Sequence, residues 1–175
     1  SGRFLARVSG KVKGNVLLRK KQYALSDDRE ARVPIATSLL LGKIANCRKV
    51  IERARRDHSF LVDMHALQTT STWLKNTLNV VRDCKTTDEL IGYEGSAAKI
   101  YFRAFDQLIL RQRQDFRFEG RTRRPPLDNM NSLLSYLYTL LTYDVASALE
   151  VAGLDPYVGF LHRDRPGRPS LALDI

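Results

Sequence analysis

Apolar side chains recur at alternating spacings of three and four residues over most of this chain, and this repeat constrains its fold more than any other feature. The first stripe, in a helix whose opening turn suits Pro34, contains Leu40, Ile44, Cys47, Ile51 and Ala54. The pattern returns at Leu67, Ser71, Leu74, Leu78 and Val81, and again at Met130, Leu134, Leu137, Leu141, Val145 and Ala148. The repeat predicts amphipathic helices that each bury one face in a core.

Capping and turn residues predict where these helices begin and end. Thr86 and Glu89 form a capping box, so a helix should start near Thr87, with an interruption around Gly92. Asp128 can cap the helix of the last stripe, and Gly153 suits the position just past its end.

Shorter elements are expected between and around these helices. We expect a short basic helix over residues 16–23 and a loop over residues 116–126. Ser170 can cap a short last helix. Residues 3–8 look extended, but no later segment is a convincing partner strand. The chain is therefore predicted to be mainly α, a multi-helix domain with a residual extended segment at its start.

The length of 175 residues fits one domain, and 43% hydrophobic with 27% charged residues excludes a disordered tail. No window resembles a membrane span or a signal peptide, so we expect a cytoplasmic protein without a membrane partner. Cys47 and Cys84 stand apart from each other and from the histidines, which favours plain buried thiols.

The positive charge is concentrated in the first third of the chain. The net charge is +10, and residues 1–60 hold 15 Lys and Arg against 5 Asp and Glu. Such asymmetry favours a polyanionic partner, with nucleic acid as the leading candidate, because neutralised phosphates release counterions. A solvated basic face that only keeps the protein soluble is the alternative.

The motifs for nucleotide hydrolysis, dinucleotide binding, acyl hydrolysis and zincin chemistry are absent, but a site for a hard divalent cation stays open. Glu94 in GYEG, His162 in FLHRDRPG and Asp174 are the candidate ligands, and Asp164 competes with Asp174. Each also has a structural interpretation: Glu94 and Asp174 can stabilise a helix dipole near a helix start, and His162 can be a solvated loop residue. Their spacing matches no general ligand signature.

Five segments together resemble one known family, the CRISPR-associated endonuclease and integrase that acquires spacers, particularly its type I-C branch. They are GNVLLRKKQY (14–23), LLLGKIANCRKVI (39–51), LIGYEGSAAKIYF (90–102), RRPPLDNMNSLLSYLYTLL (123–141) and GLDPYVGFLHRDRPGRPSLALD (153–174). They cover nearly the whole chain in the family's order. The resemblance implies a helical catalytic domain that uses Mg²⁺ or Mn²⁺.

The resemblance also implies partners and a reaction. Members form homodimers, join a small ferredoxin-like CRISPR-associated partner, and insert captured protospacer DNA into the CRISPR repeat by phosphodiester transesterification. It further implies that residues 1–14 are the tail and linker of an amino-terminal β-rich domain, and that residues 15–175 are a helical catalytic domain truncated at its carboxyl end.

Matched motif by motif, Glu94 and His162 correspond to the family's metal-binding glutamate and histidine, and Asn131 to the asparagine of its N-x-LLS active-site motif. Asp174 corresponds to the first acidic residue near the metal, whereas the usual third ligand, a carboxylate about three residues further on, falls after Ile175. Lys43, Asn46 and Arg48 match the family's GKIxNxR motif, whose asparagine and arginine either orient phosphates or tie helices together, and we expect Lys43 and Arg48 to bind nucleic acid. Arg121, Arg123 and Arg124 are expected to bind DNA phosphates.

The expected function is thus a metal-dependent DNA endonuclease and integrase, with Glu94, His162 and Asn131 in catalysis. The second hypothesis is a non-catalytic helical module for DNA binding or assembly, in which the acidic and imidazole side chains are structural.

Overall fold

The computed structural model describes residues 15–175, and they are mainly helical, as the apolar repeat predicts. The α-helices are α1 (Val16–Asp27), α2 (Arg32–Asp57), α3 (Met64–Asp83), α4 (Thr87–Ala104), α5 (Asn129–Val151) and α6 (Ser170–Asp174), with a 3₁₀ turn at Phe105–Leu108. The described part contains no β-strand. The extended segment predicted for residues 3–8 and the boundary after residue 14 lie outside the described residues.

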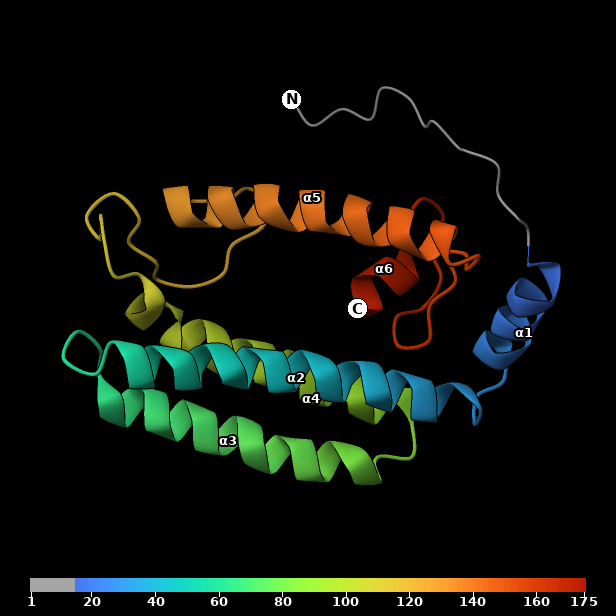
Figure 1. The fold of residues 1–175 in the computed structure, drawn as a ribbon, viewed down its shortest axis with the longest axis horizontal. Helices are drawn as coiled ribbons and strands as arrows, with labels where there is room; N and C mark the ends of the chain where they lie inside the picture. Colours follow the sequence, from blue (N-terminus) through green and yellow to red (C-terminus); the bar gives the residue numbers. More distant parts are fainter. Residues whose placement is uncertain (1–14) are drawn as a thin grey trace.

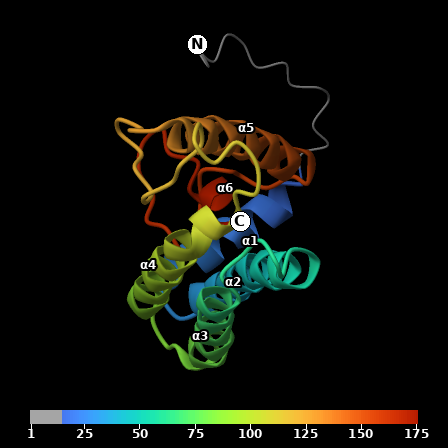
Figure 2. The ribbon, with the colours of Figure 1, turned by 90° about the vertical axis from the view of Figure 1, so that its left-hand side faces the viewer.

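Helices α2, α3 and α4 form one layer, and α5 runs above it as a second layer (Figure 1). Between the layers lie α6 and the loop of residues 153–169, and α1 stands at one end (Figures 1 and 2). No helix in this described portion is long and apolar enough to cross a membrane.

The predicted stripe of α2 faces the core, where Leu40, Ile44 and Ile51 are almost completely buried. Leu67, Leu74 and Val81 of α3 meet them from the other side, and Leu90 and Ala97 of α4 complete the layer. Phe160, Leu161 and Leu171 join the same core from the carboxyl-terminal segment. The core of the helical layer therefore also anchors the loop that carries His162.

The predicted stripe of α5 is not buried along its whole length. Leu137 and Leu141 are 48% and 57% exposed, and Leu149 is the buried apolar side chain of α5. Within the described residues α5 packs mainly against α6, so no helix covers the middle of its apolar face. The predicted stripe therefore misses the buried face of α5, because its buried residues are Asn131 and Leu149 whereas Ala148 of the stripe is exposed.

The two cysteines are free thiols, and each is half-buried rather than fully buried as predicted. Burial raises the pKa of the Cys47 thiol, although Lys43 opposes the shift. Both thiols are therefore protonated near neutral pH, in agreement with a packing role.

Candidate functional site

Glu94 lies about two turns into α4, whose start is fixed by the predicted capping box. Thr86 Oγ1 accepts the Glu89 amide at 3.2 Å, and a Glu89 carboxylate oxygen accepts the Thr86 amide at 3.3 Å. The predicted interruption at Gly92 is wrong, because α4 is continuous from Thr87 to Ala104. A single glycine costs a helix only about 1 kcal/mol, which caps and packing can offset. Glu94 is therefore held by a rigid helix and does not lie in its first turn.

His162 and Asp174 are brought together by the loop of residues 153–169 and by α6. His162 Nδ1 lies 2.7 Å from Asp174 Oδ1. The close approach depends on Gly159, where an added Cβ would lie 2.8 Å from Asp174 Oδ2 and 2.9 Å from Ser170 Cβ. A glycine is needed here for space, since a methyl group would push Asp174 away.

Asp174 is completely buried, and its carboxylate is surrounded by donors. Its Oδ2 accepts the amides of Phe160 and Leu161 at 2.7 and 2.9 Å, and its Oδ1 accepts the amide of His162 at 3.0 Å. Burial alone would raise the pKa of this carboxyl group, but the hydrogen bonds from the His162 ring and the three amides outweigh it and lower the pKa. Asp174 is thus ionised, and we assign the proton of the His162 ring to Nδ1.

This tautomer leaves His162 Nε2 with a free lone pair directed toward α4. Nε2 lies 3.7 Å from Glu94 Oε2, and the two side chains are 21% and 17% exposed. Two acceptors that face each other without a shared proton cannot form a hydrogen bond. On the other side, Glu94 Oε1 accepts a hydrogen bond from Lys43 Nζ at 2.5 Å.

The donor set of Glu94 and His162 suits a small divalent cation. Carboxylate oxygen binds Mg²⁺ and Mn²⁺, imidazole nitrogen binds Mn²⁺ as well, and such ions keep several waters. A carboxylate behind the histidine is the usual way to fix the orientation of a ligating imidazole. No cluster of three or more His, Cys, Asp or Glu side chains arranged for a metal occurs in residues 15–175, so the site offers a pair of protein ligands.

The other candidate carboxylate, Asp164, is exposed and makes no hydrogen bond or ion pair with Glu94 or His162 in the described structure. Its Oδ1 accepts the Gly159 amide at 3.4 Å, a long contact within the loop. Of the two competing aspartates, Asp174 is the one that contacts His162.

Asn131 is fully buried, and its side-chain amide is saturated by contacts within the protein. Oδ1 accepts from Arg121 and from the Thr122 amide, both at 2.9 Å. Nδ2 donates to the Gly120 carbonyl at 2.8 Å and to Asp128 Oδ2 at 2.6 Å. No donor or acceptor of this amide is left for a phosphate or a water, so the contacts do not agree with the predicted catalytic role.

Of the predicted DNA-binding residues, Lys43 pairs with Glu94, and the four arginines fall into two groups. Arg48 contacts Ser71 of α3 at 3.1 Å and Glu52 at 3.7 Å, so its contacts tie α2 to α3. Arg121 bonds Asn131 and Ser135, and its guanidinium lies over the ring of Tyr138. By contrast, Arg123 and Arg124 are exposed and make no ion pair in the described structure.

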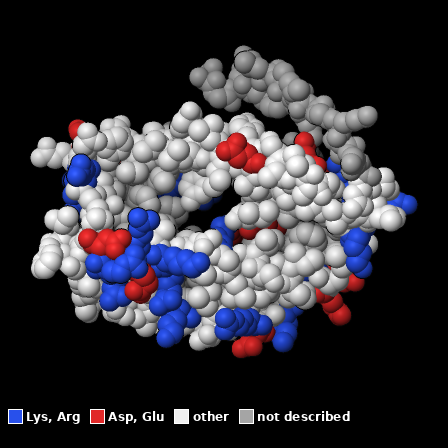
Figure 3. Space-filling model, viewed as in Figure 1, with Lys and Arg blue, Asp and Glu red and all other residues white. Residues whose placement is uncertain are grey.

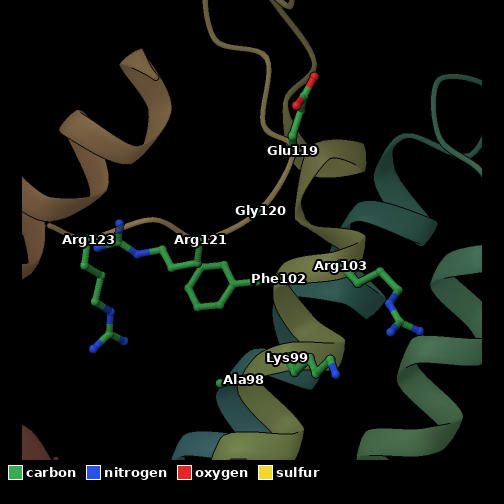
Figure 4. Close-up of a pocket in the computed structure, with 8 residues that line it drawn as sticks. All are labelled: Ala98, Lys99, Phe102, Arg103, Glu119, Gly120, Arg121 and Arg123. Carbon is green, nitrogen blue, oxygen red and sulfur yellow. The ribbon is translucent and has the colours of Figure 1, made fainter. Parts of the chain in front are cut away.

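A pocket of about 460 Å³ lies between α4 and the loop that carries Arg121 and Arg123. Four cations line it, and Figure 4 shows Phe102 pointing toward the loop while Lys99 and Arg103 leave α4 on the other side. Seen from the front, the molecule is hollowed between its two layers, with basic side chains inside the hollow (Figure 3). The lining residues are Ala98, Lys99, Phe102, Arg103, Glu119, Gly120, Arg121 and Arg123.

A set of polar residues on α1 holds the His162 loop and was not found by sequence reasoning. Gln22, which is buried, donates to the carbonyls of Asp155 and Val158 at 2.8 and 2.9 Å and accepts the Asp155 amide at 2.8 Å. Ser26 donates to the Gly159 carbonyl at 2.6 Å. The sequence signal for this contact was weak: Gln22 and Ser26 are two polar residues four apart on a short helix, and such a pair usually lies on a solvated face.

Solved structures with this helical fold include a casposase, a Cas1 protein from Thermotoga maritima and a Cas6-RT-Cas1–Cas2 complex. A partial Cas6-RT-Cas1–Cas2 complex matches with a TM-score of 0.80 and 31% identity, over 99% of this chain and 50% of that one. A casposase bound to integration product matches with a TM-score of 0.75 and 28% identity, over 91% of this chain and 43% of that one.

The sequence comparison is more specific. The family model described as CRISPR associated protein Cas1 matches residues 1–175. The CRISPR-associated endonuclease Cas1 1 of Chlorobaculum tepidum is 48% identical over 174 residues, which is 99% of this chain and 51% of the relative. The chain belongs to the Cas1 family, and it spans about half the length of the relatives it matches.

Proposed function

We propose that this chain contains the metal site of a DNA endonuclease and integrase that inserts new spacers into a CRISPR array. The observation that carries the proposal is the pairing of Glu94 with a histidine whose free nitrogen is aimed by a buried carboxylate. Relatives named CRISPR-associated endonuclease Cas1 and a similar casposase bound to integration product support the reaction class.

Glu94 and His162 are the residues that would hold Mg²⁺ or Mn²⁺. Such an ion polarises a phosphoryl group and stabilises the leaving oxygen. Asp174 keeps the His162 ring in the required tautomer and orientation, because all its acceptor positions are taken by His162 and three amides. We therefore assign Asp174 an orienting role in place of the ligand role expected from the motif.

The reaction itself is a transesterification that needs no covalent nucleophile from the protein. The 3′-hydroxyl of the incoming DNA forms a bond to phosphorus, the bridging bond of the repeat breaks, and its oxygen leaves with a proton. With water as the attacking group the same site cleaves DNA. The protein supplies orientation and charge.

The basic side chains in and beside the pocket that form no ion pair are the ones best placed to contact DNA phosphates. Arg123 and Arg124 keep their predicted role, and Lys99 and Arg103 join them. Arg48 and Arg121 instead fix α2 to α3 and the 116–128 loop to α5, and Asn131 holds the same loop. Phosphate contacts of this kind position DNA without reading its sequence.

The whole protein is proposed to act as a homodimer with a small ferredoxin-like CRISPR-associated partner, on protospacer and repeat DNA, in the cytoplasm. We also propose that residues 1–14 are the tail and linker of an amino-terminal β-rich domain and that residues 15–175 form the helical catalytic domain. A similar structure is named as a Cas1–Cas2 complex, which supports assembly with a second Cas protein.

Substitution of Glu94 by Gln in the full-length protein tests the proposal. Strand transfer and cleavage in Mn²⁺ should fall by about a hundredfold or more, since the lost carboxylate is a cation ligand. Glu30→Gln is the matched control, because Glu30 is an exposed glutamate in the turn between α1 and α2. Equal activity of Glu94→Gln and Glu30→Gln would remove Glu94 from the site and favour the non-catalytic DNA-binding module.

A further inference from the structure

Lys43 lies in the candidate site, where it contacts Glu94. It projects from α2, and its Nζ donates to Glu94 Oε1 at 2.5 Å and to the Leu173 carbonyl at 3.4 Å. Its side chain is 36% exposed, against 17% for Glu94. Of the described Lys and Arg side chains, it is the one that pairs with Glu94.

Glu94 and the ionised Asp174 bring two negative charges to this site, and the ammonium group of Lys43 offsets one of them. Glu94 directs its other oxygen at His162 Nε2, and the ionised Asp174 stands behind the imidazole ring. Carboxylates at this degree of burial are normally paired with a cation. Lys43 supplies that cation from within the protein.

A divalent cation at Glu94 would meet Lys43 on the same carboxylate. Like charges that share one carboxylate repel strongly at partly buried sites, where water screens them less. The lysine has a flexible four-carbon stem, so its Nζ can leave Glu94 while α2 stays in place. A phosphate oxygen of bound DNA is then a natural new partner for the ammonium group.

We infer that Lys43 neutralises Glu94 until a divalent cation binds, and that the cation displaces its ammonium group toward a DNA phosphate. The inference rests on the proposed metal site at Glu94 and His162. It makes Lys43 a positioning residue that couples two binding events. By linkage, DNA should tighten cation binding and the cation should tighten DNA binding by the same factor.

The test is a Mn²⁺ titration of the full-length protein, followed by the EPR signal of free Mn²⁺, with and without duplex DNA. Lys43→Met removes the competing charge and keeps much of the side-chain length, so the Kd for Mn²⁺ without DNA should fall about five- to tenfold. The tightening caused by DNA should shrink by a similar factor. Lys43→Gln is a second neutral variant, and Lys43→Arg restores the charge and should restore weaker Mn²⁺ binding.

Lys49→Met is the control for loss of one positive charge on α2. Lys49 is exposed and has no ion pair in the described structure, so its loss should change the Kd for Mn²⁺ less than twofold. A role of Lys43 in stability alone predicts weaker or equal Mn²⁺ binding in Lys43→Met, and either result would overturn the inference.

The failure of this inference can be told apart from failure of the proposed function. If wild type binds Mn²⁺, Glu94→Gln does not, and the two neutral Lys43 variants bind no tighter than wild type, the metal site stands and the displacement of Lys43 is refuted. If Mn²⁺ binding is absent from wild type or unchanged in Glu94→Gln, both proposals are refuted together.

Discussion

Asp174 shows how one buried residue can serve stability and site geometry together. Its carboxylate accepts hydrogen bonds from the His162 ring and three amides, which lower its pKa despite complete burial. Asp174→Asn replaces an acceptor with an amide that cannot satisfy these donors. We expect a loss of about 2–3 kcal/mol in the free energy of unfolding at neutral pH.

The pH dependence of this loss has a definite sign. Because the folded pKa lies below the ordinary value of 3.8, the stability from ionised Asp174 is complete above that value and disappears as pH falls through the folded pKa. Urea unfolding from about pH 7 to about pH 2 should therefore show a constant difference between wild type and Asp174→Asn above about pH 4 and a shrinking difference below it. A difference that stays constant down to the lowest pH would contradict an ionised Asp174.

Gly159 gives a second prediction at the scale of the residue. Gly159→Ala places a Cβ 2.8 Å from Asp174 Oδ2, so it should destabilise the protein by about 1–3 kcal/mol and weaken Mn²⁺ binding through His162. Gly92→Ala is the matched control, because its Cβ would meet nothing within 4 Å. Within α4 this change should stabilise by about 0.5–1 kcal/mol. Thermal melts of the two variants should move in opposite directions.

At the scale of the element, α1 acts as a brace for the His162 loop. Gln22 and Ser26 bond backbone groups of residues 155–159, so the loop is fixed at a point only a few residues before His162. Arg32, at the start of α2, adds a hydrogen bond to the Phe160 carbonyl at 2.7 Å. The histidine is thus oriented by Asp174 from one side and by its own braced loop from the other.

Gln22→Ala tests this brace. It leaves half-buried backbone groups of Asp155 and Val158 without their protein partner and should cost about 1–2 kcal/mol of stability. Amide hydrogen exchange over residues 153–162 should rise more than exchange in α3, since the loop opens first. Lys21→Ala, at an exposed position of the same helix, should leave exchange unchanged. Uniformly faster exchange throughout the protein would argue against a local brace.

Over the whole molecule, the sequence predicted where helices form better than it predicted which surfaces pack against each other. The stripe of α2 and the capping box of α4 are local patterns, and the structure confirms both. The break at Gly92 was wrong, since one glycine does not outweigh the rest of a capped and packed helix. The exposure of Leu137 and Leu141 was equally unpredictable, because periodicity marks an apolar face without specifying what covers it.

In the candidate site, too, the sequence indicated the residues but not the contacts between them. Glu94 and His162 were identified by resemblance to a family, whereas no spacing rule would pair residues so far apart in sequence. Their approach to 3.7 Å results from the packing of the carboxyl-terminal segment into the α2–α4 core. The braces at Gln22 and Ser26 escaped prediction because their partners are backbone groups, which leave no pattern in the sequence.

If Glu94 and His162 bind one cation, pulsed EPR of Mn²⁺ bound to the full-length protein can detect the ligand nitrogen of His162. Wild type should show coupling of Mn²⁺ to one imidazole nitrogen. His162→Gln should lose that coupling, and Glu94→Gln should bind Mn²⁺ much more weakly. A nitrogen coupling that survives in His162→Gln, or its absence from Mn²⁺-loaded wild type, would rule out His162 as a ligand of the ion.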